Sequence, residues 1–141
     1  MASTLKINTL TGVSTAGSIA VTGEGNSTTT NMQSGLAKAW VNFNHTTIDS
    51  GTDLDGVRDS FNVASVVDNS AGAYTVSFSN AMSSTSYSAS GLIALENDAG
   101  SFNPLSVANR ATASYRLDCE NNSSSNSDPV AVDAQIFGDL A

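Results

Sequence analysis

The sequence predicts an all-β protein: an antiparallel β-sandwich of jelly-roll-like type that carries an extended N-terminal arm. Two observations predict the fold class. From residue 37 onward, short runs of residues alternate between apolar and polar, which is the period of a half-buried strand. These runs are separated by turn-rich clusters such as DNSAG, SNAMSS and ENDAG, and no segment has a helical repeat of useful length. Stacked antiparallel sheets with one buried face each show this pattern.

Residues 1–36 form the expected arm. Residues 4–10 (TLKINTL) and 18–22 (SIAVT) alternate, so each can make one short strand, and turn-rich segments follow both. Two isolated strands are not a stable sheet. The arm must therefore lie on the following domain, on a neighbouring copy or on another protein, the alternative being an unstructured terminus. The residues expected at such an interface are Leu5, Ile7, Ile19 and Val21.

Residues 37–141 form the expected sandwich domain, in which six stretches alternate. They are residues 38–43, 60–68, 73–79, 87–96, 106–120 and 129–138. The residues expected to share an apolar face are, in order, Ala39, Val41 and Phe43; Phe61, Val63 and Val67; Tyr74, Val76 and Phe78; Ile93 and Leu95; Tyr115, Leu117 and Cys119; and Val130, Val132, Ala134 and Ile136.

The stretch GLAKAWVNFN (residues 35–44) joins the arm to the first strand of this domain and contains the only tryptophan, Trp40. The alternation places Trp40 opposite Val41 and Phe43. Two interpretations remain open. Trp40 covers an outer face that a neighbouring copy or the arm occludes, which makes it an interface residue, or it belongs to the ordinary core, as most tryptophans do.

Composition limits the possible functions. Only 30 of 141 residues are Leu, Ile, Val or Phe, so the chain can bury only a small core, and oligomerisation is a usual remedy. The net charge is −8 and the five Lys and Arg are scattered, which argues against nucleic-acid binding.

No apolar run is as long as the roughly 18 residues that a membrane-spanning helix needs. The N-terminus lacks a signal-peptide core, so we expect synthesis in the cytoplasm of the producing cell.

The sequence contains no recognisable set of catalytic residues, and no cofactor is expected. His45 is the only histidine; with 23 serines in the chain, a Ser-His-Asp set is almost uninformative, and a solvated loop histidine is the simpler interpretation. The acidic loop of residues 49–59 is a weak candidate calcium site through Asp53 and Asp55. It lacks the ending and the flanking helices of an EF-hand, so an acidic surface turn is the simpler interpretation.

Three segments together carry a family resemblance: TGEGNSTTTNMQSGLAKAWVNFN, RDSFNVASVVDNSAGAYTVSFSNAM and the ending AQIFGDLA. They resemble small virion structural proteins and tail-fibre end domains of marine tailed bacteriophages, over about residues 2–95 and the last ten. The loops NHTTIDSGTDLDGV and ENNSSSNSD depart from the pattern of that family.

The resemblance implies a non-enzymatic virion protein, made in the host bacterium and assembled as a homotrimer. Its arm would attach to other phage proteins, and its β-domain would be displayed as a short fibre or a tail-fibre or tail-tip component that adheres to a host surface glycan or protein. A capsid decoration or cement protein is the alternative, and a polysaccharide depolymerase is the least favoured one. Nucleic acid and membrane are not expected as partners.

Overall fold

The computed structural model describes residues 5–12, 19–23, 29–48, 54–95, 105–121 and 123–141. The chain divides into two compact units, residues 1–36 and residues 37–141. Within the described ranges, no helix is long and apolar enough to cross a membrane.

The first unit contains a small antiparallel pair of strands. Strand β1 (Ala20–Thr22) pairs with β2 (Thr29–Asn31), and one helical turn, α1 (Met32–Gly35), follows. The strand expected in residues 4–10 is wrong, since the described residues 5–12 include no strand. The partner of β1 instead comes from the polar stretch around Thr29 and Thr30, whose β-branched side chains suit an extended backbone.

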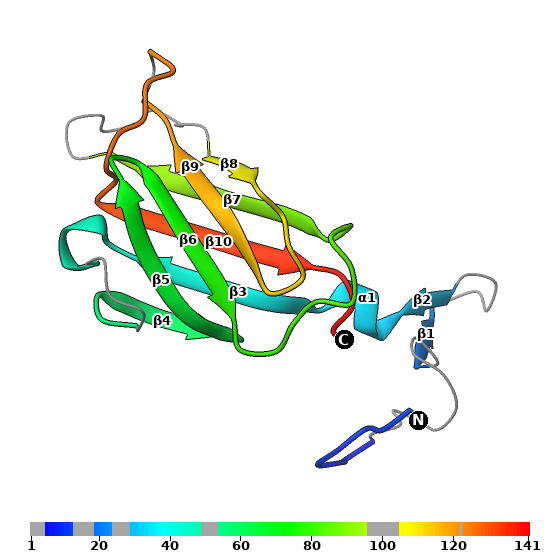
Figure 1. Cartoon of the computed structure of the whole chain (residues 1–141). Helices are drawn as coiled ribbons and strands as arrows, with labels where there is room; N and C mark the ends of the chain where they lie inside the picture. The colour runs from blue at the N-terminus through cyan, green and yellow to red at the C-terminus, as the bar shows by residue number, and fades with distance from the viewer. Residues whose placement is uncertain (1–4, 13–18, 24–28, 49–53, 96–104, 122) are drawn as a thin grey trace. The chain divides into compact units, whose positions relative to one another are not determined.

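The second unit is all-β, as predicted, and its strands form two four-stranded antiparallel sheets (Figure 1). The first sheet has the order β4-β3-β10-β7 and the second has the order β5-β6-β9-β8. The strands are β3 (Ala37–Phe43), β4 (Val57–Phe61), β5 (Val63–Ser70), β6 (Ala73–Phe78), β7 (Ser88–Ala94), β8 (Leu105–Ala108), β9 (Ser114–Cys119) and β10 (Ala131–Phe137). A 3₁₀ turn, η1 (His45–Thr47), follows β3.

The two sheets lie one over the other and share a single core (Figure 1). Alternate side chains of β3, β6, β9 and β10 point into it, as the sequence pattern predicts. In β5 the register shifts after Val63, so Val63 and Val66 are buried while Val67 is only partly buried, and the prediction that Val67 shares the buried face of Val63 is wrong. Phe43 of β3 meets Tyr74 of β6 edge to face, with ring centroids 5.1 Å apart, which ties one sheet to the other. The largest fully buried side chains include Val41, Phe43, Val66, Tyr74, Val76, Tyr115, Leu117, Val132 and Ile136.

The strand order is nested. The first strand of the unit, β3, pairs with the last, β10, and inside that pair β6 pairs with β9 in the other sheet. Strand pairing therefore brings together residues that are far apart in the sequence, such as Val41 and Ala134. This places β3 and β10 side by side in the middle of one sheet, where their outward side chains form a common surface.

Two predicted strands are each divided by an asparagine in the left-handed region. Asn62 (φ 56°) separates β4 from β5, and Asn109 (φ 45°) follows the end of β8 before β9 begins. The prediction that Phe61 shares a buried face with Val63 is therefore wrong. The corner at Asn62 sends the two residues to different sheets, and Phe61 is 51% exposed while Val63 is buried.

Asn62 also holds its corner together through its side chain. The carboxamide oxygen accepts hydrogen bonds from the backbone N–H and the side-chain amide of Asn80, at 2.7 and 3.1 Å. The carboxamide nitrogen donates to the carbonyl oxygens of Lys38 and Asn80, both at 3.0 Å. One side chain thus links β3, the corner after β4 and the turn after β6.

We predict that Asn62→Ala lowers the free energy of unfolding by about 3 kcal/mol, because it removes these bonds and forces a Cβ-bearing residue without a local partner to keep a positive φ. Urea denaturation measures the change. Asn62→Gly is the matched control, since glycine adopts this φ without strain, and it should be about 1 kcal/mol more stable than the alanine variant. Equal stabilities of the two variants would contradict a left-handed corner.

Candidate functional site

The outer faces of the two sheets differ in chemistry. On the β4-β3-β10-β7 sheet, Trp40 lies in register between Phe61 of β4 and Gln135 of β10. Phe61 is 51% exposed and Leu92 of β7 is 58% exposed, while Trp40 is partly exposed. Large apolar side chains are thus exposed on the outer face of this sheet, although the chain has only 30 Leu, Ile, Val and Phe residues with which to fill its core.

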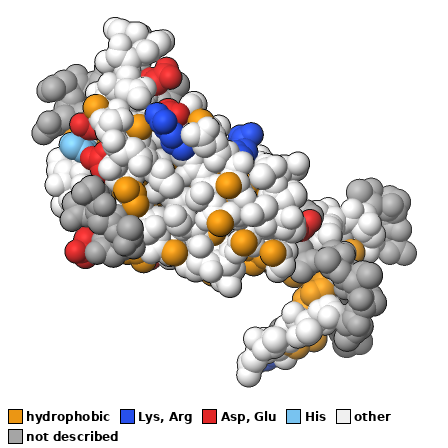
Figure 2. Space-filling model, in the orientation of Figure 1, with side chains coloured by type: hydrophobic (Ala, Val, Ile, Leu, Met, Phe, Trp, Pro, Cys, Tyr) orange, Lys and Arg blue, Asp and Glu red, His pale blue; other side chains and the backbone are white. Residues whose placement is uncertain are grey.

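The outer face of the β5-β6-β9-β8 sheet is mainly polar. Arg116 and Asp118 of β9 form an ion pair at 2.7 Å, and the Asn69 amide donates to the Thr75 hydroxyl at 2.8 Å. Figure 2 looks onto this side of the molecule, where polar surface dominates and apolar side chains are scattered. Scattered apolar side chains are ordinary for a protein surface. Trp40 and Phe61 lie opposite each other on neighbouring strands of the other sheet, and they mark that sheet as the candidate functional face.

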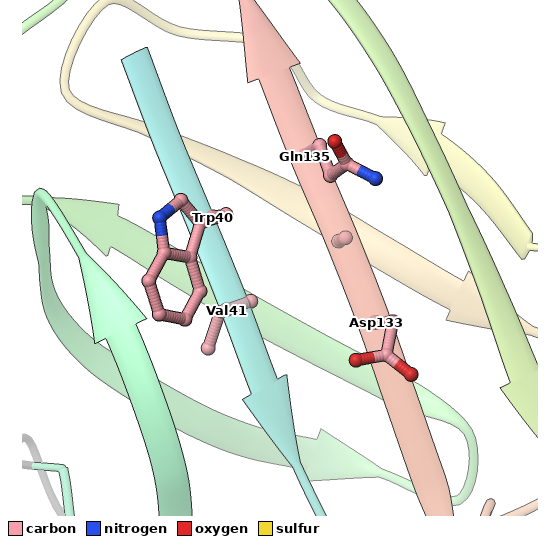
Figure 3. Close-up of a pocket in the computed structure, with 5 residues that line it drawn as sticks. Trp40, Val41, Asp133 and Gln135 are labelled. Atoms are coloured by element: carbon pink, nitrogen blue, oxygen red, sulfur yellow. The ribbon is translucent and has the colours of Figure 1, made fainter. Parts of the chain in front are cut away.

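A shallow hollow of about 290 Å³ lies on the candidate face. Its lining residues are Trp40, Val41, Asp133, Ala134 and Gln135. Figure 3 shows the broad side of the indole ring of Trp40 on β3, with Asp133 and Gln135 projecting from the neighbouring strand β10.

Asp133 is oriented by a polar chain along the same face. The Asn42 amide donates a hydrogen bond to the Asp133 carboxylate. Arg58 of β4 donates to the Asn42 carboxamide oxygen at 3.4 Å and to the Val130 carbonyl at 3.3 Å. The carboxylate is thus held beside the hollow and keeps acceptor capacity for a further donor.

Trp40 is placed by the structure on the outer face, and it is absent from the core cluster, so the interpretation as ordinary core is wrong. Its contact with a neighbouring copy stays a prediction. Sequence reasoning missed Phe61, Asp133 and Gln135 as its neighbours. Only the alternation within residues 129–138 carried a signal, because it placed Asp133 and Gln135 opposite the buried Val132, Ala134 and Ile136.

The other expected interface residues lie in the first unit. Leu5 is 80% exposed, and Ile7 and Val21 are about half exposed. Ile19 is partly buried, and its carbonyl accepts a hydrogen bond from the Met32 N–H at 2.9 Å. Their contact with another chain stays a prediction.

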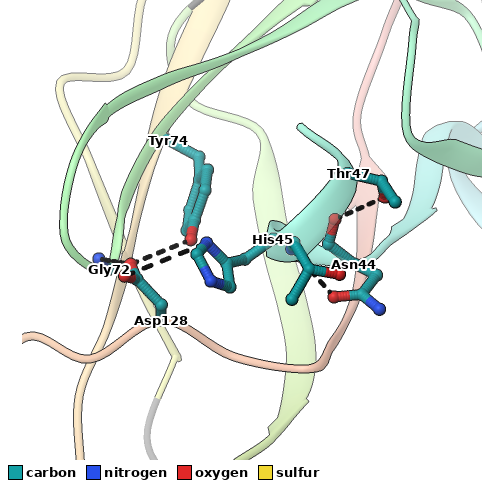
Figure 4. Close-up of polar contacts among 7 residues, drawn as sticks. Asn44, His45, Thr47, Gly72, Tyr74 and Asp128 are labelled. Carbon is teal, nitrogen blue, oxygen red and sulfur yellow. Dashed lines mark hydrogen bonds and ion pairs between the residues drawn. The ribbon is translucent and has the colours of Figure 1, made fainter. Parts of the chain in front are cut away.

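A second polar cluster lies at one end of the domain (Figure 4). Asp128 accepts hydrogen bonds from the Gly72 N–H at 2.6 Å and from the Tyr74 hydroxyl at 3.2 Å. Burial, and then the Asp128 charge, raise the pKa of Tyr74 far above its ordinary value. Gly72 has a φ of +67°, and a Cβ there would meet backbone atoms of Cys119 and Ser127. Asp128 thus fixes the turn between β5 and β6, which is a structural role.

His45 lies beside this cluster. Its Nδ1 is 3.9 Å from an oxygen of Asp128, and both side chains are about one-third exposed. His45 Nδ1 is enclosed and has no hydrogen-bond partner among the described residues. The expectation of a simply solvated histidine is therefore wrong, because η1 folds the ring against the domain.

The candidate calcium residues are only partly within the structure. Asp53 lies outside the described residues, and Asp55 is exposed in the turn before β4. Among the residues that the structure describes, no three His, Cys, Asp or Glu side chains come together as metal ligands.

Cys119 is buried, as expected for a small core residue. Burial raises the pKa of its thiol to about 12, with smaller contributions from Asp118 and Asp128. The thiol therefore stays protonated and unreactive at neutral pH.

No protein-family model, curated protein or solved structure matches this chain.

Tyr115 provides a test of the core electrostatics, because its hydroxyl is buried with no hydrogen-bond partner among the described residues. Burial raises its pKa above the ordinary value of 10. The folded protein thus keeps this proton above pH 10 while the unfolded chain releases it. Stability that is present below pH 10 is therefore lost as the pH rises toward the folded-state pKa.

We predict that Tyr115→Phe leaves the free energy of unfolding at pH 7 unchanged or raises it by about 1 kcal/mol. Above pH 10 the variant should lose about 1.4 kcal/mol less per pH unit than the parent protein. Tyr74→Phe is the control, because it removes a hydrogen bond to Asp128 and should destabilise the protein at pH 7. Urea denaturation between pH 7 and pH 11 measures both; a clear loss at pH 7 for Tyr115→Phe would show that its hydroxyl is bonded.

Proposed function

We propose that the protein is a non-enzymatic structural protein of a bacteriophage virion. It is a homotrimeric short fibre, or a tail-fibre or tail-tip component. The arm (residues 1–36) anchors it to other virion proteins, and the β-domain (residues 37–141) is displayed for adhesion to a host surface. The resemblance of the GLAKAWVNFN and AYTVSF segments to such proteins supports this assignment.

The observation that carries the proposal is the exposure of large apolar side chains in the arm. Leu5, Ile7, Leu10, Val21 and Leu36 are each at least half exposed. A chain with few large apolar residues loses stability when it leaves them in water, since burying one such side chain is worth about 2 kcal/mol. The exposure is accounted for when another chain covers these residues in the assembled particle.

The second unit has an outer sheet face that suits display on the particle. Two four-stranded antiparallel sheets fit a β-sandwich, but β3 and β4, β5 and β6, and β8 and β9 pair within one sheet. The jelly-roll-like order expected from the sequence, in which consecutive strands enter alternate sheets, is therefore not found among the described strands. Such a domain presents a whole sheet face to its surroundings. Here that face is the β4-β3-β10-β7 sheet with Trp40 and Phe61.

Capsid decoration is the alternative, because an arm with exposed apolar side chains can also clamp capsid subunits. The two locations differ in copy number: closed symmetric shells carry on the order of hundreds of decoration subunits, and a fibre carries tens. A depolymerase would need two carboxylates roughly 5–10 Å apart across a groove. Among the lining residues of the described hollow, Asp133 is the one carboxylate.

We predict that the double variant Leu5→Ser/Ile7→Ser folds as the parent does but is depleted from virions about tenfold or more, because it removes apolar contacts of the arm. The β-domain does not need these residues for its core. Quantitative mass spectrometry of particles grown with each variant measures incorporation, and the parent copy number separates fibre from decoration.

Lys6→Ser is the matched control. Lys6 lies between the two substituted residues and is exposed like them, so its loss should leave incorporation unchanged. Normal incorporation of the double variant, or absence of the parent protein from particles, would contradict the proposed role.

A further inference from the structure

The hollow on the β4-β3-β10-β7 sheet combines one flat aromatic surface with two planar hydrogen-bonding groups. Trp40 on β3 supplies the ring, and Asp133 and Gln135 project from the neighbouring strand β10 (Figure 3). The volume of about 290 Å³ lies at the lower end of the range for small-molecule sites. This size suits one or two sugar-sized rings.

The polar groups of the hollow retain hydrogen-bonding capacity. Gln135 has an exposed side chain, and its amide has no hydrogen bond to any residue that the structure describes. The Asp133 carboxylate accepts from Asn42, which leaves further lone pairs for a ligand. Because Asn42 in turn accepts from Arg58, the carboxylate is held in place before a ligand arrives, which lowers the cost of binding.

The ligand that matches this surface has an apolar face and a rim of hydroxyl groups. A pyranose ring has both: its axial C–H groups pack on an indole, and its hydroxyls donate to a carboxylate and exchange hydrogen bonds with an amide. The charge of the protein also limits which sugars can bind. Asp133 in the lining of the hollow and a net charge of −8 on the chain disfavour an anionic sugar.

A second copy of the chain fits the hollow less well. A two-fold contact between two equivalent faces would bring Asp133 and its counterpart together in a desolvated interface, and two like charges there are costly. The apolar side chains of the arm offer a contact between copies that carries no such charge.

We propose that the hollow lined by Trp40, Asp133 and Gln135 binds a neutral hexopyranose unit of a cell-surface polysaccharide. The proposal rests on the adhesive role proposed for the β-domain and names the ligand class and the site. Trp40 stacks on the sugar ring, and Asp133 and Gln135 hold its hydroxyls.

The test uses the full chain and the fluorescence of Trp40, which is the only tryptophan and so reports on this site alone. The probes are neutral hexasaccharides of glucose, mannose and N-acetylglucosamine, with a galacturonic acid hexamer as the anionic contrast. We expect a saturable fluorescence change at millimolar or lower concentrations with at least one neutral probe and none with the anionic one. Gln135→Ala should weaken the affinity about tenfold.

Two further variants complete the test. Ser77→Ala, on the outer face of the opposite sheet, is the matched control and should bind as the parent does. Trp40→Leu, measured by calorimetry, should bind at least about tenfold more weakly. The proposal is overturned if no neutral probe binds, if the anionic probe binds equally well, or if Gln135→Ala and Trp40→Leu bind normally.

The outcomes also separate this site from the proposed function. A protein that is found on virions but binds no neutral probe would remove the sugar site and leave the virion role intact. A protein that is absent from virions but binds a sugar through Gln135 would remove the virion role and leave the sugar site intact.

Discussion

The contact between the inner faces of the two sheets is the constraint on which the rest of the structure depends. The chain has only 30 Leu, Ile, Val and Phe residues, so it can fill one layer between two sheets and little else. Phe43 against Tyr74 shows how that layer is closed, with aromatic rings from opposite sheets in edge contact. Nested pairing of β3 with β10 follows, because it brings the most regular apolar faces of the chain to the centre of one sheet.

A chain under this constraint should not place large apolar side chains on the outside unless something covers them. Phe61, Leu92 and the apolar residues of the arm break that rule, while the outer face of the β5-β6-β9-β8 sheet obeys it. The departures fall into two groups with different chemistry. The arm residues are accompanied by polar, mostly uncharged neighbours and suit contact with protein, whereas Trp40 is accompanied by Asp133 and Gln135 and suits a hydroxylated ligand.

The sequence was sufficient for the inward faces of most strands, because alternation is local: Ala39, Val41 and Phe43 are buried as predicted, and so are Tyr115, Leu117 and Cys119. It was insufficient at Asn62 and Asn109, where a left-handed residue divides what reads as one strand. The neighbours of Trp40 in the candidate site were harder to predict from the sequence than the strand boundaries. Trp40 meets Phe61 and Gln135 through strand register, and the pairing of β3 with β10 joins segments about ninety residues apart, which no local pattern encodes.

The most direct test of assembly through exposed apolar surface is the native mass of the purified protein, measured by light scattering over a range of concentrations. We expect a mass of three times the chain mass of 14.4 kDa at every concentration, because a chain with only 30 Leu, Ile, Val and Phe residues buries a small core and gains stability from assembly. A mass of one chain throughout, together with an arm that resists proteolysis, would contradict it.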